Sequence, residues 1–466
     1  TPAMSHLYLS AGHKSSGKTT LTLGLAAAFR AEGSTVQAFK KGPDYIDPLW
    51  LTTATGRACY NLDFRTQSHA EITSLFARRS EDIDLCLVEG NKGLHDGMAL
   101  NGSDSNAAMA KLLGAPVVLV IDTRGMTRGV APLLLGLQQF DTEVDVAGVV
   151  FNLVGGPRHA SKLRQVVEHY TDIPVLGSVQ RHRDLSIDER HLGLVPSNEA
   201  SAAEAKIRFL GRAISEQVDL AAIRAIARRA SPVTDPRPPA RTEVPPVKAS
   251  GLSIGILRDS AFGFYYPDDL ERFRAAGAQL VFIDALHDDA LPDIDGLFIG
   301  GGFPETHAAQ LESNTNLRGA IADALAAGLP AYAECGGLMY LARSLSWQGE
   351  RHEMVGVIPG DIVMHRRPVG RGYVRIREDA EHPWTEGMTS TLPESIDAHE
   401  FHHSSLENLA PNQRFAYQVE RGHGIDGTHD GLVIGNLLAG YSHQRHVASN
   451  PWVDRFLDFV ARVRGH

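Results

Sequence analysis

Residues 12–19 read GHKSSGKT, and this stretch decides the fold of the first half of the chain. It matches G-x-x-x-x-G-K-[ST], the phosphate-binding loop that joins a strand to a helix. It follows a strand expected at residues 7–10 and opens a helix expected at 19–31, rich in Ala and Leu, as that loop requires. Backbone N–H groups of such a loop surround phosphate oxygens, and the helix N-terminus adds positive potential. We therefore predict an ATP site formed by Gly12, His13, Lys14, Ser15, Ser16, Gly17, Lys18, Thr19 and Thr20.

Short apolar stretches alternate with helical patterns on both sides of the chain's middle. In the first half, strands are expected at residues 36–39, 85–88, 115–122, 146–153 and 174–179, with a further helix at 105–113. Near-continuous apolar strands separated by helices indicate a parallel sheet covered on both faces. The pattern restarts with strands at 252–257, 280–283, 296–299 and 330–334, and helices at 267–276, 317–327 and 337–345. The chain is therefore expected to form two α/β domains.

A proline-rich segment separates these two patterns. Residues 231–250 read SPVTDPRPPARTEVPPVKAS. Proline lacks the backbone donor and fixes φ, so this stretch favours neither a helix nor a central strand. We predict a phosphate-loop domain at 4–230, a linker at 231–250 and a second domain at 251–466.

Composition narrows the class of protein. Lys and Arg number 45 against 55 Asp and Glu, which gives a net charge of -10 and no bulk attraction for nucleic acid. The apolar runs are too short to span a bilayer, and no signal-peptide pattern is evident. The cysteines, Cys59, Cys86 and Cys335, lie far apart and show no zinc spacing. The cytoplasm is the expected compartment.

Two further motifs suit magnesium and phosphate. Residues 39–48, FKKGPDYIDP, follow the second strand, where Lys40 and Lys41 could hold phosphate or a substrate carboxylate and Asp47 could hold Mg²⁺. Glu89 ends a buried strand, like the acid that completes a Mg²⁺ shell in phosphate-loop enzymes. A polar turn and a strand-end cap are the structural alternatives. We predict a metal site of Thr19, Asp47 and Glu89. Asn152 is expected either to read an adenine edge or to act as a cap.

The second domain carries a different chemistry. Residues 331–338, AYAECGGL, place Cys335 on a sharp strand-to-helix turn, as in a nucleophile elbow. A helix N-terminus at this point is expected to lower the thiol pKa. Gly301 and Gly302 end the preceding strand and could donate N–H groups to an oxyanion. The base is expected in YSHQRH, residues 441–446, and a buried structural cysteine is the alternative.

Three histidines gather at residues 398–404, AHEFHHS. The H-x-x-H-H pattern lacks the spacing of a helical zinc site, so we favour a binding surface or folded loop over a metal.

Together these residues resemble the cobyrinate a,c-diamide synthase family. The stretches that carry the resemblance are GPDYIDP (42–48), RHLGLVP (190–196), RDSAFGFYYPDDL (258–270), GGGFPE (300–305), AECGGLMYL (333–341) and HEFHHS (399–404). The resemblance implies an ATP-dependent synthetase domain, similar to dethiobiotin synthetase, joined to a class I glutamine amidotransferase domain. It further implies that Cys335 forms a glutamyl thioester, that ATP and Mg²⁺ activate a carboxylate as an acyl phosphate, and that ammonia travels inside the protein to amidate the a- and c-acetates of a tetrapyrrole.

The chain departs from the family pattern at three places. The base of the family usually lies in a Tyr-x-His-x-His-Phe pattern, and this chain reads YSHQRHVASNP at 441–451. Alignment from the tyrosine makes His443 the base, and alignment from the ASNP end makes His446 the base. Both stay open, with His443 preferred. No acidic residue stands two positions after this histidine, where many class I amidotransferases carry the third member of a catalytic triad. This absence fits a Cys–His dyad. The loop after Glu89 reads NKGLHDG, more polar than the usual form, and resembles the DsrN branch. That resemblance implies sirohaem as the substrate, and a corrinoid precursor and sirohaem both stay open. Substrate contacts are expected from Lys41, Asp44, Tyr45, Lys92 and Asp96.

Two other classes of function are alternatives to an amidating enzyme. A phosphate-loop ATPase switch would not need a reactive thiol, and a non-catalytic tetrapyrrole-binding protein would not need Lys18, Thr19 and Glu89. The expected partners are glutamine and a tetrapyrrole, without nucleic acid or membrane, and a homodimer is one candidate assembly.

Overall fold

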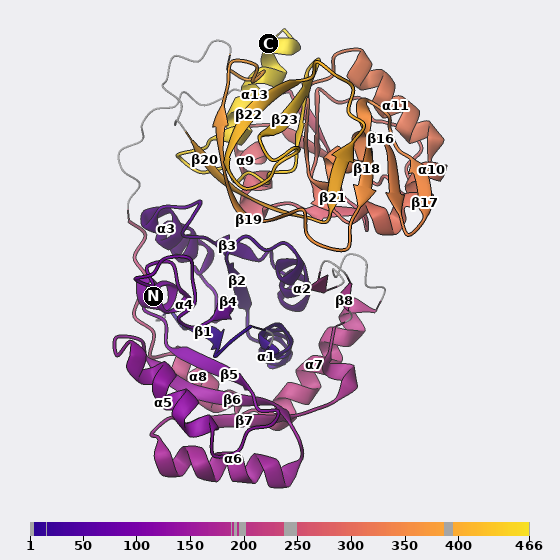
Figure 1. Cartoon of the computed structure of the whole chain (residues 1–466). Helices are drawn as coiled ribbons and strands as arrows, with labels where there is room; N and C mark the ends of the chain where they lie inside the picture. The colour runs from indigo at the N-terminus through magenta and orange to yellow at the C-terminus, as the bar shows by residue number, and fades with distance from the viewer. Residues whose placement is uncertain are drawn as a thin grey trace. The chain divides into compact units, whose positions relative to one another are not determined.

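The computed structural model describes residues 4–14, 16–187, 189–190, 193–194, 202–236, 249–385 and 395–465. The chain divides into two compact units, unit 1 (Thr1–Ala240) and unit 2 (Arg241–His466). This division falls inside the proline-rich segment, of which 237–248 lies outside the described residues, as does Ser15. Each unit is built around its own sheet (Figure 1).

Unit 1 contains a seven-stranded sheet in the order β3-β2-β4-β1-β5-β6-β7, and every neighbouring pair in it runs parallel. Its strands are β1 (His6–Ala11), β2 (Val36–Lys41), β3 (Tyr60–Leu62), β4 (Leu85–Gly93), β5 (Val117–Asp122), β6 (Val146–Val154) and β7 (Val175–Gln180). Apolar runs such as VVLVID in β5 are buried along almost their whole length, as strands covered on both faces must be.

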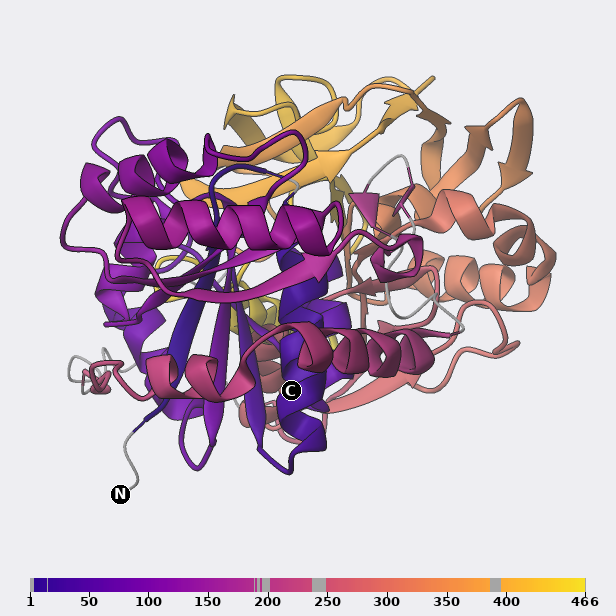
Figure 2. The ribbon, with the colours of Figure 1, turned by 90° about the horizontal axis from the view of Figure 1, so that it is seen from below.

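Helices cover both faces of this sheet (Figures 1 and 2). One core contains residues of α1 (Lys18–Ala31), α2 (Ile46–Thr55), α7 (Ala203–Gln217) and α8 (Leu220–Ala227). The other contains residues of α3 (His69–Arg79), α4 (Asn106–Leu112), α5 (Val130–Phe140) and α6 (Pro157–Tyr170). A short 3-10 helix (Arg183–Leu185) and the strands β8 (Glu189–Arg190) and β9 (Gly193–Leu194) follow β7. The predicted parallel sheet with two helical layers is confirmed.

Unit 2 contains a nine-stranded mixed sheet in the order β12-β10-β13-β15-β24-β23-β22-β19-β20. The parallel strands are β10 (Ser253–Leu257), β12 (Gln279–Ile283), β13 (Gly296–Ile299), β15 (Ala331–Glu334) and β24 (Leu437–Gly440). The antiparallel extension is β23 (His429–Ile434), β22 (Arg414–Arg421), β19 (Gly370–Glu378) and β20 (Ile396–His402). Here too the carboxyl ends of the parallel strands share one edge of the sheet.

The two faces of the unit 2 sheet are covered differently. The helices α9 (Pro267–Ala275) and α13 (Trp452–Val463) pack on one face. The other face is covered by α10 (Ala308–Ser313), α11 (Thr315–Ala326), α12 (Gly336–Leu341) and a small sheet of β17 (Glu350–Glu353), β16 (Ala342–Trp347), β18 (Ile358–Met364) and β21 (Ser404–Glu407). The helix expected at 337–345 is therefore too long, because β16 begins at Ala342 and pairs with β17 and β18. A strand pair, β11 (Phe262–Phe264) with β14 (Gly301–Gly302), and a 3-10 helix (Pro304–His307) complete the unit.

Candidate active sites

The phosphate loop lies between β1 and α1, at the edge of the sheet formed by the carboxyl ends of its strands. Gly17 has a φ of 86°, and a Cβ on it would lie 2.0 Å from Asn152 Nδ2, so only glycine fits there. The Asn152 amide donates a hydrogen bond of 2.9 Å to the Ser16 carbonyl oxygen. Asn152 at the end of β6 therefore supports the loop, a contact that the adenine prediction did not include.

The loop has the features needed to receive phosphate. Ser16 is fully buried, and among the described residues its hydroxyl has no hydrogen-bond partner. Lys18 opens α1 and is buried, and both that burial and the Lys40 charge lower its pKa. His13 and Lys14 are exposed, whereas Thr20 is half-buried. An uncompensated hydroxyl beside a lysine and a helix N-terminus suits a nucleotide phosphate.

Behind the loop, two carboxylates converge on one hydroxyl. Thr19 Oγ1 lies 3.0 Å from Asp47 Oδ2 and 2.6 Å from Glu89 Oε1. Lys40 Nζ lies 2.8 Å from Asp47 Oδ2 and 3.2 Å from Glu89 Oε1, and it donates to the Gly90 carbonyl oxygen. The three residues predicted as a metal site therefore lie together, with a lysine ammonium among them that the metal prediction did not include.

Burial and charge set the ionisation of this cluster. Burial and the Asp47 charge raise the pKa of Glu89, against the opposing Lys40 charge. Burial also opposes ionisation of Asp47, but the Lys40 charge and hydrogen bonds from Lys40 and Thr19 leave its pKa below the usual value. Three carboxylates overcome the burial of Lys40 and raise its pKa. Lys40 is therefore held as a cation, with the ionised Asp47 carboxylate beside it.

These residues fit a magnesium ion. Glu89 Oε2 is buried without a hydrogen-bond partner among the described residues, so one carboxylate oxygen is uncompensated. No group of three or more His, Cys, Asp or Glu side chains suited to a metal occurs in the part of the chain that the structure describes. Mg²⁺ commonly takes only one or two carboxylates and completes its octahedron with phosphate and water.

The predicted substrate residues fall into two groups. Lys41 and Tyr45 are buried, and Asp44 Oδ1 accepts from the Ile46 N–H at the start of α2. Lys41 Nζ lies 3.2 Å from Asn91 Oδ1, and burial lowers its pKa to about 8.

The second group lies at the end of β4 and on the loop that follows it. Lys92 and Asp96 are exposed there. A Cβ on Gly93 would lie 2.5 Å from Asp96 Oδ2 and 2.7 Å from the Gly12 carbonyl oxygen. The Asp96 carboxylate therefore lies near the Gly12 carbonyl oxygen of the phosphate loop, beyond the end of β4, the strand that carries Glu89.

In unit 2, Cys335 occupies the turn between β15 and α12. Its φ of 48° is a strained left-handed value for a residue with a side chain, as in a nucleophile elbow. The Cys335 N–H donates to the Gly440 carbonyl oxygen, and Sγ lies 3.8 Å from the Phe401 carbonyl oxygen. The elbow thus continues the β15–β24 pairing and contacts the end of β20.

The expected oxyanion loop and base meet at this elbow. A Cβ on Gly336 would lie 2.9 Å from the Gly302 N atom, so that N–H lies beside the residue following Cys335. A Cβ on Gly301 would lie 2.7 Å from His443 Cε1. The structure therefore brings Cys335, Gly301, Gly302 and His443 to one edge of the sheet.

His443 and His446 take different directions. His443 forms a two-way main-chain bridge with His399, and their rings stack with centroids 4.9 Å apart. His446 Nδ1 instead accepts from the Val453 N–H in the first turn of α13. We therefore keep His443 as the candidate base.

The expectation of a lowered thiol pKa is wrong. Burial and the charges of Glu305, Glu334 and Glu400 raise the pKa of Cys335, although the Gly336 N–H opposes them. Burial, followed by the charges of His399 and His402, lowers the pKa of His443. The resting site therefore holds a neutral thiol and a neutral imidazole.

The stretch HEFHHS forms the end of β20 and the residues beyond it rather than a loop, and His402 bonds Glu400 at 3.0 Å.

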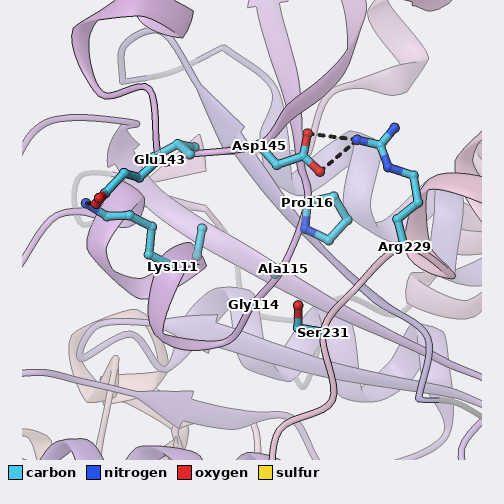
Figure 3. Close-up of a pocket in the computed structure, with 10 residues that line it drawn as sticks. Lys111, Gly114, Ala115, Pro116, Glu143, Asp145, Arg229 and Ser231 are labelled. Carbon is cyan, nitrogen blue, oxygen red and sulfur yellow. Dashed lines mark hydrogen bonds and ion pairs between the residues drawn. The ribbon is translucent and has the colours of Figure 1, made fainter.

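A pocket of about 360 Å³ lies at the opposite edge of the unit 1 sheet, where β5 and β6 begin (Figure 3). Its charges are paired: Arg229 lies 2.7 Å from Asp145, and Lys111 lies 2.6 Å from Asp141 and 3.8 Å from Glu143. None of the predicted site residues lines it, and we assign it no role.

Comparisons with known proteins agree with this arrangement. One family model, a CobQ/CobB/MinD/ParA nucleotide binding domain, matches residues 9–195, and a CobB/CobQ-like glutamine amidotransferase domain matches 253–451. A protein of Magnetococcus marinus named cobyrinate a,c-diamide synthase is 43% identical over 98% of this chain and 97% of its own length. Its namesake in Methanosarcina acetivorans is 38% identical over 98% of this chain and 95% of its own length.

A solved structure described as a putative GMP synthase protein of Thermoplasma acidophilum aligns with a TM-score of 0.34 and 16% identity, over 46% of this chain and 96% of that one. A search of the described helices finds no segment with the length and apolar character needed to cross a bilayer.

Proposed function

The chain belongs to the cobyrinate a,c-diamide synthase family, and from this membership we propose that it uses ATP and glutamine to amidate the a- and c-acetate carboxylates of a cobyrinate-type tetrapyrrole. It is a carbon–nitrogen ligase with a nucleotide-binding and an amidotransferase domain. The domains are assigned to 4–230 and 251–466, joined by the linker at 231–250. The observation that carries the proposal is the elbow at Cys335, with Gly302 and His443 beside it.

Unit 2 would release ammonia from glutamine. Cys335 Sγ attacks the side-chain amide carbon while its proton passes to His443, and the Gly301 and Gly302 N–H groups stabilise the oxyanion. His443 returns the proton to the leaving nitrogen, so the C–N bond breaks and a glutamyl thioester and ammonia form. Water then hydrolyses the thioester to glutamate. This assignment is supported by the approach of Gly301 to the His443 ring.

Unit 1 would activate the carboxylate. A carboxylate is a poor acyl electrophile, and transfer of the γ-phosphoryl group of ATP to its oxygen creates a phosphate leaving group that ammonia displaces. Lys18 and the loop amides would hold the phosphates, and Thr19, Asp47 and Glu89 would hold Mg²⁺, which neutralises phosphate charge when bound. Lys40 is already paired with Asp47 and Glu89, and its ammonium would shift in response to the charges of Mg²⁺ and phosphate. Asn152 would fix the loop through Ser16.

The substrate would lie against the loop that follows β4. The exposed Lys92 would attract the carboxylates of a polyanionic macrocycle, and Asp96 lies near Gly12 of the phosphate loop. The names of the relatives favour cobyrinate, and Lys92 in the polar NKGLHDG loop is the observation that keeps sirohaem as a second candidate.

The test is amidation with each candidate substrate. The protein is incubated with ATP, Mg²⁺ and glutamine, and with cobyrinic acid, hydrogenobyrinic acid, sirohydrochlorin or sirohaem in separate reactions, and the products are analysed by mass spectrometry. Conversion of two carboxylates to amides in cobyrinic or hydrogenobyrinic acid supports the proposal. Turnover of sirohaem alone would move the assignment to the second candidate. ATP hydrolysis without any amide would favour a switch protein, and tetrapyrrole binding without turnover would favour a binding protein.

A further inference from the structure

Glu334 is a buried carboxylate directly before the nucleophile, and the mechanism above gives it no role. It ends β15 with only 2% of its surface exposed. Its Oε2 accepts from the Gln444 backbone N–H at 2.6 Å and from the Tyr332 hydroxyl at 2.7 Å. Its other oxygen, Oε1, lies 4.0 Å from His443 Nδ1. One carboxylate therefore both anchors the residue after the base and faces the base itself.

The position of Glu334 relative to Cys335 follows from the strand. Side chains alternate along β15, and Tyr332 packs with the α9 and α13 core whereas Ala333 and Cys335 pack with the opposite core. Glu334 thus approaches His443 from a different side than the thiol does. A carboxylate behind the imidazole and a nucleophile in front of it is the spatial order of a catalytic triad.

We propose that Glu334 is the positioning acid of the glutamine site: it holds the loop that carries His443 and stabilises the imidazolium that forms when Cys335 gives up its proton. The sequence after His443 offers Gln444 and Arg445, and the Arg445 guanidinium is itself paired with Asp268 at 3.0 Å. The dyad expected from sequence thus acquires its acid from the residue preceding the cysteine. This inference rests on the proposed glutaminase reaction at Cys335.

The electrostatic surroundings of Glu334 make this role dependent on pH. Burial raises its pKa to about 8, the Asp269 and Asp430 carboxylates add to the rise, and the bonds from Gln444 and Tyr332 oppose it. The Glu334 charge in turn adds to the rise that burial causes in the pKa of the Tyr265 hydroxyl and of the Cys335 thiol. The ionised fraction grows as the pH rises through about 8, and the ionised form is the one that stabilises an imidazolium. Glutaminase activity is expected to rise across the same interval.

The experiment compares glutaminase kcat/KM as a function of pH in the wild-type protein and in five variants. Glu334→Gln keeps the shape and removes the charge; we expect a loss of at least about tenfold, less than the roughly 10⁴-fold cost of neutralising a triad acid, and loss of the rise near pH 8. Glu334→Asp keeps the charge and is expected to retain the rise with partial activity. Tyr332→Phe removes a bond that favours ionisation, and the rise is expected to move to higher pH.

Asp430→Asn is the matched control. Asp430 is another buried carboxylate that anchors the same loop, through Tyr441 and Ser442, and it raises the Glu334 pKa. The rise is expected to persist in this variant and to move to lower pH. Tyr332→Phe and Asp430→Asn are expected to shift the pH of the activity rise in opposite directions. The inference therefore stays testable if Glu334→Gln does not fold.

Cys335→Ala separates failure of this inference from failure of the proposed function. Glutaminase activity that survives in Cys335→Ala would overturn the proposed reaction. An inactive Cys335→Ala, together with a Glu334→Gln variant of normal activity and unchanged pH profile, would overturn the role of Glu334 alone. A Glu334→Gln variant of lower activity that keeps the rise near pH 8 would also overturn it, because Glu334 would then be only a structural anchor.

Discussion

The hydroxyl of Thr19 lies 2.6 Å from Glu89 Oε1, although the two residues are 70 positions apart in the chain. Thr19 is in the first turn of α1, and Glu89 lies within β4, which pairs directly with β1. The parallel sheet thus brings the phosphate loop and a buried carboxylate to one point. We propose that nucleotide chemistry in unit 1 depends on this pair and on Lys40, which contacts Glu89.

Lys18→Ala is expected to abolish ATP-dependent amidation while glutamine hydrolysis stays measurable, because Lys18 serves only the phosphates. Lys111→Ala, at the opposite edge of the same sheet, is the control and is expected to amidate normally. The two activities are measured on the same preparation by product mass and by glutamate release. Normal amidation by a folded Lys18→Ala variant would overturn the phosphate-loop assignment.

Lys40→Met is expected to destabilise unit 1 at neutral pH. The substitution leaves Asp47 and Glu89 buried without their cation, a loss typically worth about 3–5 kcal/mol. Mg²⁺ is expected to recover more stability in this variant than in the wild type, because the ammonium no longer competes for the same oxygens. Denaturation with and without Mg²⁺ measures both effects.

The control for Lys40→Met is Lys111→Met, which breaks a partly exposed pair and is expected to cost no more than about 1 kcal/mol. Equal losses in the two variants, or no difference in their response to Mg²⁺, would contradict a cation site at Lys40.

Cys335→Ser is expected to lose glutamine-dependent amidation and to keep amidation with high ammonium, because free ammonia bypasses the thioester. Cys86→Ser, at a buried cysteine of unit 1, controls for loss of a thiol as such. If ammonium fails to rescue a folded Cys335→Ser variant, Cys335 has a role other than nucleophile.

His443→Ala is expected to lower the glutaminase rate by roughly 10²–10⁴, the usual contribution of a general base. His446→Ala is expected to have a milder effect, because its ring bonds the Val453 N–H at the start of α13. Both variants are expected to be near normal with ammonium. The reverse ranking would transfer the role to His446, and two small effects would argue against a histidine base.

Asp44→Asn is expected to flatten the pH dependence of stability. Burial and the Asp47 charge raise the pKa of Asp44 from 3.8 to about 7, so within this window the folded protein binds a proton that the unfolded chain has released. The contribution of Asp44 to stability therefore falls as the pH rises from about 4 to about 7. Asparagine can still accept from the Ile46 N–H. Identical pH dependence of denaturation in variant and wild type would contradict the raised pKa.

Local patterns were enough to predict much of both sites. The phosphate loop, the acid that follows the apolar residues 85–88 and the elbow at Cys335 each depend on a few consecutive residues, and their chemistry could be predicted from residue type and spacing. Lys40 differs, because its contact with Glu89 depends on the register of β2 against β4, where the two residues are paired. Lys40 and Lys41 are consecutive in the sequence, and the sequence alone did not indicate which of them faces the carboxylates.

The sequence was least informative where distant segments control a site. The thiol pKa of Cys335 is set by burial and by Glu305 and Glu400, so the helix N-terminus did not decide its direction. None of the strands from β16 to β24 was predicted; in β19, GRGYVRIRE, charged residues interrupt the apolar signal. The contact of Glu334 with His443 likewise needed the folded loop after β24.

The most direct test follows the glutamine nitrogen. The protein is given ATP, Mg²⁺, a cobyrinate-type substrate and glutamine labelled with ¹⁵N at the side-chain amide, and the product is analysed by mass spectrometry. We predict ¹⁵N in two amides of the product, with no amide formed when ATP is omitted and none from glutamine when Cys335 is replaced by serine. Glutamine and ATP hydrolysis that leave every acetate of the tetrapyrrole unamidated would contradict the proposed function.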